Sequence, residues 1–188
     1  MKLLSIFLIL LLASAQVKTP SALDDFAKAQ SAIYSIDTKA ELKGYAGAVT
    51  RLNLHSSESK IALKSRKAFS VTLGDGRTMY SRIELYKYEF DTKEKCLQAG
   101  NALLACFPND CQKIIRGADG SAKITPSVVI FGSQTIVIAV TNCESADEKW
   151  ADLKKEFVKA FAQETDELIE TGCGGLKWTT KEKIVSGL

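Results

Sequence analysis

The strongest secondary-structure signal in the sequence is a pair of apolar segments joined by a short turn: VVIFGSQTIVIAVT, residues 128–141. Gly132-Ser133 predicts a two-residue type II′ turn, in which Gly occupies the first position and the twist suits a hairpin. Both predicted strands, 128–131 and 134–141, are apolar at consecutive positions, so neither face of the hairpin is polar. We therefore expect this hairpin in the centre of a sheet, covered on both sides.

The elements predicted around the hairpin alternate between strand and helix. A strand over 78–90 precedes a helix that Asp91 caps. After the hairpin, a long helix starts at Ser145 and stops near Gly172, and residues 176–179 form a last strand. The order from the first strand is therefore strand, helix, strand, strand, helix, strand.

This order of elements predicts an α+β fold. It matches the split βαβ, or ferredoxin-like, arrangement, in which a four-stranded antiparallel sheet carries two helices on one face. We assign this arrangement to residues 78–180. The likeness is one of element order alone, and a fold does not by itself carry a function.

The N-terminal part is predicted to be mainly helical. Ser21 with Asp24 forms a capping box for a first helix, and residues 38–41 form a second box ahead of an apolar stripe. The polar segment 56–67 shows no pattern that assigns it, and a β-hairpin is expected from residue 68 onward. We expect residues 16–188 to form a single domain, with 16–67 as its helical part and 68–188 as the sheet with its packed helices.

The first fifteen residues have the pattern of a cleavable secretory signal. Lys2 precedes a short apolar centre, and Ala13-Ser14-Ala15 forms an Ala-x-Ala cleavage site. We expect cleavage after Ala15 and a secreted protein, extracellular or periplasmic, with no membrane span after signal cleavage. The formal net charge of +3 falls to +2 when Lys2 is removed, which does not favour a nucleic acid as partner.

The five cysteines of an exported chain predict disulfides, and their odd number leaves at least one over. In the split βαβ arrangement, Cys96 and Cys173 lie at the same end of the sheet, so we predict a Cys96–Cys173 bridge. A second bridge within the remaining three is expected, with Cys106–Cys111 preferred and Cys143 left over. The spacing favours neither a zinc site nor a dithiol oxidoreductase, and we expect no metal and no cofactor.

One strand carries the candidate binding residues. Alternation along 78–90 places five large or charged side chains on one face, and Tyr and Arg are enriched where proteins bind partners. The alternative is that N-terminal helices cover this face and the tyrosines belong to the core. The candidate residues are Tyr80, Arg82, Glu84, Tyr86 and Tyr88.

Two classes of function remain open. The sequence carries no assembled catalytic set, which favours a secreted, non-catalytic binding or interaction domain for an unknown protein or small-molecule ligand. The alternative is a secreted hydrolase that uses the single histidine or clustered carboxylates, since these groups act as general acids and bases. The residues concerned are His55, Asp24, Asp25, Glu164, Asp166 and Glu167.

Overall fold

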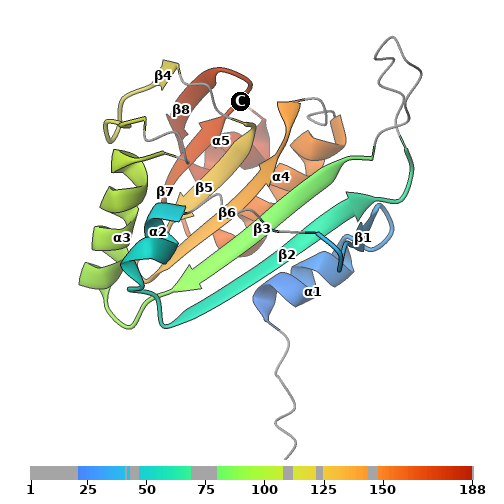
Figure 1. The fold of residues 1–188 in the computed structure, drawn as a ribbon. Coiled ribbons are helices and arrows are strands. Elements are labelled where there is room, and N and C mark those ends of the chain that lie inside the picture. Colours follow the sequence, from blue (N-terminus) through green and yellow to red (C-terminus); the bar gives the residue numbers. More distant parts are fainter. Residues whose placement is uncertain are drawn as a thin grey trace, which may run out of the picture.

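An eight-stranded antiparallel sheet forms the centre of the molecule, with the strand order β1-β2-β3-β6-β5-β7-β8-β4 (Figure 1). The computed structural model describes residues 21–40, 42, 47–68, 80–107, 112–121, 125–143 and 148–187. The strands are β1 (Tyr34–Ile36), β2 (Ser57–Ser65), β3 (Arg82–Glu89), β4 (Gly120–Ser121), β5 (Ser127–Phe131), β6 (Thr135–Thr141), β7 (Glu167–Thr171) and β8 (Gly175–Thr179). The helices are α1 (Ala22–Ala29), α2 (Gly47–Leu52), α3 (Lys93–Ala105), α4 (Glu148–Phe161) and α5 (Lys181–Ser186).

The predicted hairpin is confirmed as the centre of this sheet. β5 and β6 pair with each other, β6 also pairs with β3, and β5 also pairs with β7. Side chains from alternate positions enter two separate hydrophobic clusters: Val137 and Ala139 lie in one, Ile136 and Ile138 in the other. A strand that is apolar on both faces is stable here because both of its faces are removed from water.

Helices cover both faces of the sheet. Side chains of α1, α4 and α5, among them Phe26, Phe157 and Ile184, pack on one face. Side chains of α2 and α3, among them Val49 and Leu103, pack on the other. The described part of the chain is thus three layers deep, with α2 and α3 in front of the sheet in the view of Figure 1.

The α+β class agrees with this architecture, but the strand order does not confirm the ferredoxin-like arrangement. The long helix predicted to extend to Gly172 ends at Phe161, and the segment Glu167–Thr171 is strand β7 instead. β7 pairs along the free edge of β5, which would otherwise leave backbone groups unpaired. In addition, the unassigned segment 56–67 contains the nine-residue strand β2.

Two of the predicted helix caps agree with the structure to within a residue. Ser21 and Asp24 form the predicted capping box: Asp24 N donates to Ser21 Oγ at 3.3 Å, and Ser21 N donates to Asp24 Oδ2 at 2.8 Å. Helix α3 begins one residue later than expected, because Thr92 is its N-cap and Asp91 instead forms an ion pair with Lys95. The second box does not start a helix where predicted, because residues 38–40 are not helical and α2 begins at Gly47. Glu41 of that box lies outside the described residues, as do the signal segment 1–15 and residues 69–79 of the predicted hairpin.

The turn of the central hairpin also differs by one residue from the prediction. Gly132 N donates to Thr135 O at 2.9 Å, so Ser133 and Gln134 form the two-residue loop. Gly132 is not one of the described glycines with positive φ, so it does not provide a type II′ turn. Its missing side chain matters sterically, because a Cβ there would lie 2.7 Å from Thr135 Oγ1.

The predicted Cys96–Cys173 bridge is wrong: Cys173 is bonded to Cys143, with a Cα–Cα distance of 5.7 Å, and Cys96 is free and buried. The register explains this pairing. Ser127 at the start of β5 lies opposite both Val140 of β6 and Thr171 of β7, so the ends of these two strands meet at one edge of the sheet. Cys143 follows shortly after the end of β6, and Cys173 follows shortly after the end of β7. Cys106 is disulfide-bonded, and its predicted partner Cys111 lies outside the described residues.

In the parts of the chain that the structure describes, none of the helices combines the length and the apolar character needed to span a bilayer.

Candidate functional site

The predicted binding strand changes from exposed to buried along its length. Tyr80 is 45% exposed, whereas Tyr86 and Tyr88 are 1% and 0% exposed. Both buried rings lie in the cluster that α2 and α3 cover. Because an enclosed ring cannot contact a partner, the accessible members of the set are Tyr80, Arg82 and Glu84.

Each accessible side chain of this strand already has a partner within the chain. Arg82 Nη2 pairs with Asp37 Oδ2 at 3.0 Å, and Glu84 Oε2 accepts a hydrogen bond from the Tyr86 hydroxyl at 2.5 Å. The Lys64 ammonium lies 4.3 Å from the centroid of the Tyr80 ring, which is cation–π geometry. Because these side chains already have partners within the chain, fewer of their hydrogen-bonding and charged groups are available to a ligand.

Tyr88, at the buried end of the strand, has a perturbed hydroxyl. Burial raises its pKa to about 12, and the neighbouring Glu58 carboxylate acts in the same direction, while the Thr50 side chain opposes them. His55 packs edge-on against the same ring at 5.6 Å between centroids. The phenol is therefore neutral at ordinary pH and serves as core.

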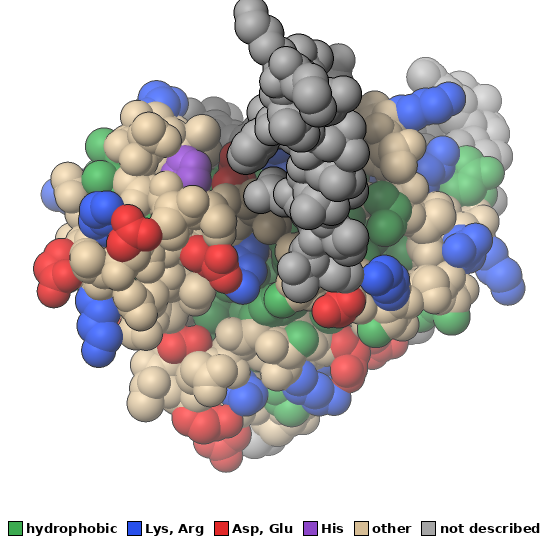
Figure 2. Space-filling view, turned by 90° about the horizontal axis from the view of Figure 1, so that it is seen from below, with side chains coloured by type: hydrophobic (Ala, Val, Ile, Leu, Met, Phe, Trp, Pro, Cys, Tyr) green, Lys and Arg blue, Asp and Glu red, His purple; other side chains and the backbone are tan. Residues whose placement is uncertain are grey.

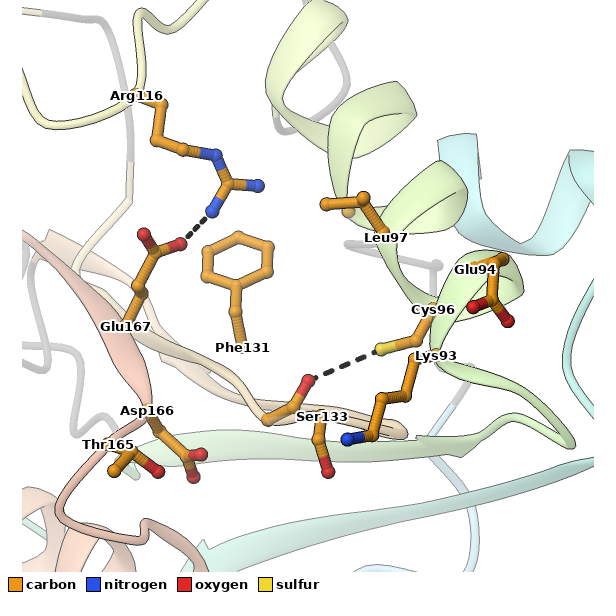
Figure 3. Close-up of a pocket in the computed structure, with 12 residues that line it drawn as sticks. Lys93, Glu94, Cys96, Leu97, Arg116, Phe131, Ser133, Thr165, Asp166 and Glu167 are labelled. Carbon is orange, nitrogen blue, oxygen red and sulfur yellow. Dashed lines mark hydrogen bonds and ion pairs between the residues drawn. The ribbon is translucent and has the colours of Figure 1, made fainter.

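A cleft of about 420 Å³ lies where α3 meets the β5–β6 turn and the start of β7 (Figure 3). The first turns of α3 form one wall, and Thr165 to Glu167 with Arg116 form the opposite wall. Phe131, Gly132 and Ser133 lie between them. The lining therefore comes from four segments that are far apart in the sequence.

The inner surface of the cleft between its two walls, here called the floor, is apolar and depends on a glycine. Phe131 projects into the space between the walls, and Leu97 of α3, which is 57% exposed, faces it (Figure 3). Gly100 lets the Phe131 ring approach α3 closely, since a Cβ at Gly100 would lie 3.3 Å from Phe131 Cδ1. A small apolar group could pack here without displacing a protein side chain.

Arg116 closes one end of the cleft. Its guanidinium lies 5.8 Å from the centroid of Phe131 and 5.9 Å from that of Trp178, whose rings stack 6.3 Å apart. The same group forms an ion pair with Glu167 and a hydrogen bond to Asn101 Oδ1 at 3.3 Å. Several contacts therefore hold this arginine in one orientation, which makes it part of the wall.

The floor also contains the free thiol of Cys96. Cys96 Sγ donates to the Gly132 carbonyl oxygen at 3.4 Å, and burial raises the thiol pKa to about 11, with the Asp166 carboxylate adding to the effect. Nucleophilic cysteines instead have a lowered pKa, because the thiolate is the reactive form. The surroundings of Cys96 thus favour a packing role.

The rim bears charges of both signs on either side of the turn. Lys93 and Asp166 extend along the two sides of Ser133 in Figure 3. Among the described residues, Lys93 forms no ion pair, although its charge acts on the neighbouring Glu94 carboxyl. Asp166 Oδ2 accepts a hydrogen bond from Gln163 N at 2.8 Å. The Glu94 carboxyl at the start of α3 has a lowered pKa because its own backbone N–H and the Thr92 hydroxyl stabilise its charged form.

The residues considered for a hydrolase lie in several places. Asp24 caps α1, Asp25 forms an ion pair with Lys28, and Glu164 forms one with Lys181. Only Asp166 and Glu167 of that set line the cleft. No group of three potential metal ligands is found among the described residues. Where Figure 2 views the surface, acidic and basic side chains are interspersed and neither sign forms a continuous patch.

The cleft residues Lys93, Arg116 and Phe131 carry no local pattern by which sequence reasoning could have joined them. Their segments meet only through the pairing of β5 with β7 and the packing of α3 on the sheet. Comparisons with protein-family models, with curated proteins and with solved structures found no match for this chain.

Proposed function

We propose that the protein is a secreted, non-catalytic binding domain whose ligand site is the cleft between α3, the β5–β6 turn and the start of β7. The observation that carries the proposal is the combination of an apolar floor at Phe131 with a separate ammonium and carboxylate, Lys93 and Asp166, on the rim. Small-molecule sites commonly combine an apolar body with a few convergent polar groups.

The ligand class follows from these groups. The Lys93 ammonium donates to a carboxylate, and the Asp166 carboxylate accepts from an ammonium. An apolar or aromatic group of the same molecule would pack on Phe131 and Leu97. The ligand is therefore a small zwitterion with an apolar side chain, such as a free amino acid or the end of a short peptide.

Secretion is part of this proposal and rests on two observations. Lys2, the apolar centre that follows it and Ala13-Ser14-Ala15 form the pattern of a secretory signal. The Cys143–Cys173 disulfide is compatible with an oxidising compartment, in which such bonds form and persist.

Calorimetric titration with L-phenylalanine and two derivatives tests the ligand assignment. The amide derivative lacks the carboxylate, and the N-acetyl derivative lacks the ammonium. Because a hydrogen bond to a charged group contributes about 1.5–3 kcal/mol, Lys93→Met should weaken L-phenylalanine binding at least ~tenfold and leave amide binding unchanged. Asp166→Asn should likewise weaken L-phenylalanine and leave the N-acetyl derivative unaffected.

Lys28→Met on α1 is the matched control, because it removes a lysine that lies on the opposite face of the sheet. It should bind L-phenylalanine as the unsubstituted protein does. The proposal is overturned if none of the three probes binds saturably, or if Lys93→Met and Asp166→Asn bind them all like the control.

A further inference from the structure

Strand β2 has an open edge along its first half. β1 pairs only with the last three residues of β2, placing Tyr34 to Ile36 against Ser65 to Leu63. Asp37 N extends this contact by one bond, donating to Ala62 O at 2.8 Å. Among the described residues, no strand pairs with 57–61 on the side away from β3, and in Figure 1 this half of β2 forms the margin of the sheet.

The backbone groups that point out of this edge can be identified from the Ala62 bond. Along a strand, the N–H and C=O of every second residue point to the same side. Since Ala62 O points away from β3, so do the N–H and C=O of Lys60 and Glu58. An edge of this kind is a template for pairing with another strand.

The side chains at these two positions carry opposite charges. Lys60 Nζ lies 3.9 Å from Glu58 Oε1, and the two side chains are 50% and 25% exposed. Both lie on one face of the sheet with Ser59 between them on the other. Charged residues normally protect an edge strand from pairing, because like charges meet when strands align.

Here the charges complement themselves in one antiparallel register. A two-fold axis at Ser59 places Glu58 opposite Lys60 of a second copy, and Lys60 opposite Glu58 of that copy. Axes at Glu58 or at Lys60 would instead place like charges opposite each other. A two-fold axis between two residues would place a residue whose N–H and C=O point outward opposite a residue whose N–H and C=O point toward β3. The register centred on Ser59 thus satisfies both the hydrogen bonds and the charges.

We propose that β2 pairs with β2 of a second copy of this chain, antiparallel and centred on Ser59, so that the two sheets become continuous. Isologous contacts of this kind are the commonest way in which soluble proteins form dimers. Because the pairing covers only residues 57–61, the association is concentration-dependent and sensitive to salt.

Sedimentation velocity on the purified protein between about 1 µM and about 1 mM tests the proposal. Lys60→Glu places two acidic residues opposite two acidic residues, and Glu58→Lys places four basic ones together. Each single variant should dissociate at least ~tenfold more readily than the unsubstituted protein. The double variant Glu58→Lys with Lys60→Glu restores opposite charges and should associate again. An equimolar mixture of the two single variants should also associate, as a heterodimer.

Two controls keep these outcomes interpretable. Asp152→Lys on α4 makes the same change of charge as Glu58→Lys, but away from β2, and should leave the association unchanged. Glu58→Lys loses the contact with Tyr88 in the single and the double variant alike, so the difference between those variants reports the charge pairing. A protein that sediments as a monomer throughout the range overturns the proposal. So does association that persists in both single variants, or that neither the double variant nor the mixture recovers.

Discussion

Gly100 of α3 lies against the ring of Phe131, so that a Cβ on the glycine would be 3.3 Å from Phe131 Cδ1. The ring cannot retreat freely, because Trp178 stacks on it and Arg116 lies beside it. The width of the cleft therefore depends on the absence of a side chain at this position of the helix.

Replacing Gly100 should accordingly affect stability and ligand binding together. Gly100→Leu inserts a side chain into the cleft floor, and overpacking of this kind costs about 1–3 kcal/mol. L-phenylalanine should no longer bind. Gly172→Leu is the control, since a Cβ at Gly172 meets no atom within 4 Å, and denaturant unfolding should show a change below about 0.5 kcal/mol. Full binding by Gly100→Leu would mean that the ligand does not occupy this cleft.

The tyrosines of β3 should differ sharply in their contribution to stability. Tyr86→Ala leaves a cavity in the core and removes the hydrogen bond to Glu84, so we expect a loss of about 3–5 kcal/mol, as for buried aromatic residues. Tyr80→Ala removes an exposed ring and its contact with Lys64, and about 1 kcal/mol or less should be lost. Thermal and urea unfolding compare the two. Equal, small effects would place Tyr86 at the surface.

Alkaline pH should destabilise the protein through Cys96. The folded-state pKa of the thiol is raised from 9.0 to about 11, so between these pH values the folded protein keeps a proton that the unfolded chain has lost. Stability is then fully present below about pH 9 and falls as the pH rises. The loss should approach about 1 kcal/mol by pH 10, since one pH unit corresponds to 1.36 kcal/mol.

Urea unfolding at pH 8, 9 and 10 on the unsubstituted protein and on Cys96→Ala isolates this contribution. The variant lacks the thiol and should lose less stability over the interval. Parallel pH dependences for the two proteins would show that the thiol pKa is not raised on folding.

Peptide mapping without reduction should yield a fragment that joins Cys143 to Cys173. The bond closes a loop with a sequence separation of 30 residues, which corresponds to about 3–4 kcal/mol of stabilisation in the chain-entropy treatment. Cys143→Ser should lower the free energy of unfolding by that order. A fragment joining Cys96 to Cys173 would contradict the strand pairing of β5 with β6 and β7.

Protein recovered from a secreting host should begin at Gln16. N-terminal sequencing and intact mass determine the cleavage position directly. Folded, exported protein that still carries residues 1–15 would refute the signal-peptide interpretation.

Several elements could be predicted because their signals are local. The Ser21–Asp24 box needs only four consecutive residues, and the hairpin 128–141 needs only its two apolar segments and the short polar break between them. By contrast, residues 167–171 looked like a continuation of α4, because Leu168 follows the apolar spacing of that helix. Pairing with the free edge of β5 favours a strand there instead of a helix. The residues of the segment alone do not indicate that this edge is available.

The sequence alone determined the position of the central hairpin, the presence of helices α1, α3 and α4, and the apolar character of both faces of β5 and β6. Only the tertiary structure decided which cysteines meet, that Tyr86 and Tyr88 are enclosed, and that Lys93 and Asp166 share a cleft. The reason is physical. Caps, turns and periodicity depend on bonds within a few residues, whereas disulfide pairing, burial and cleft lining depend on which strands become neighbours, and that choice minimises the free energy of the whole chain.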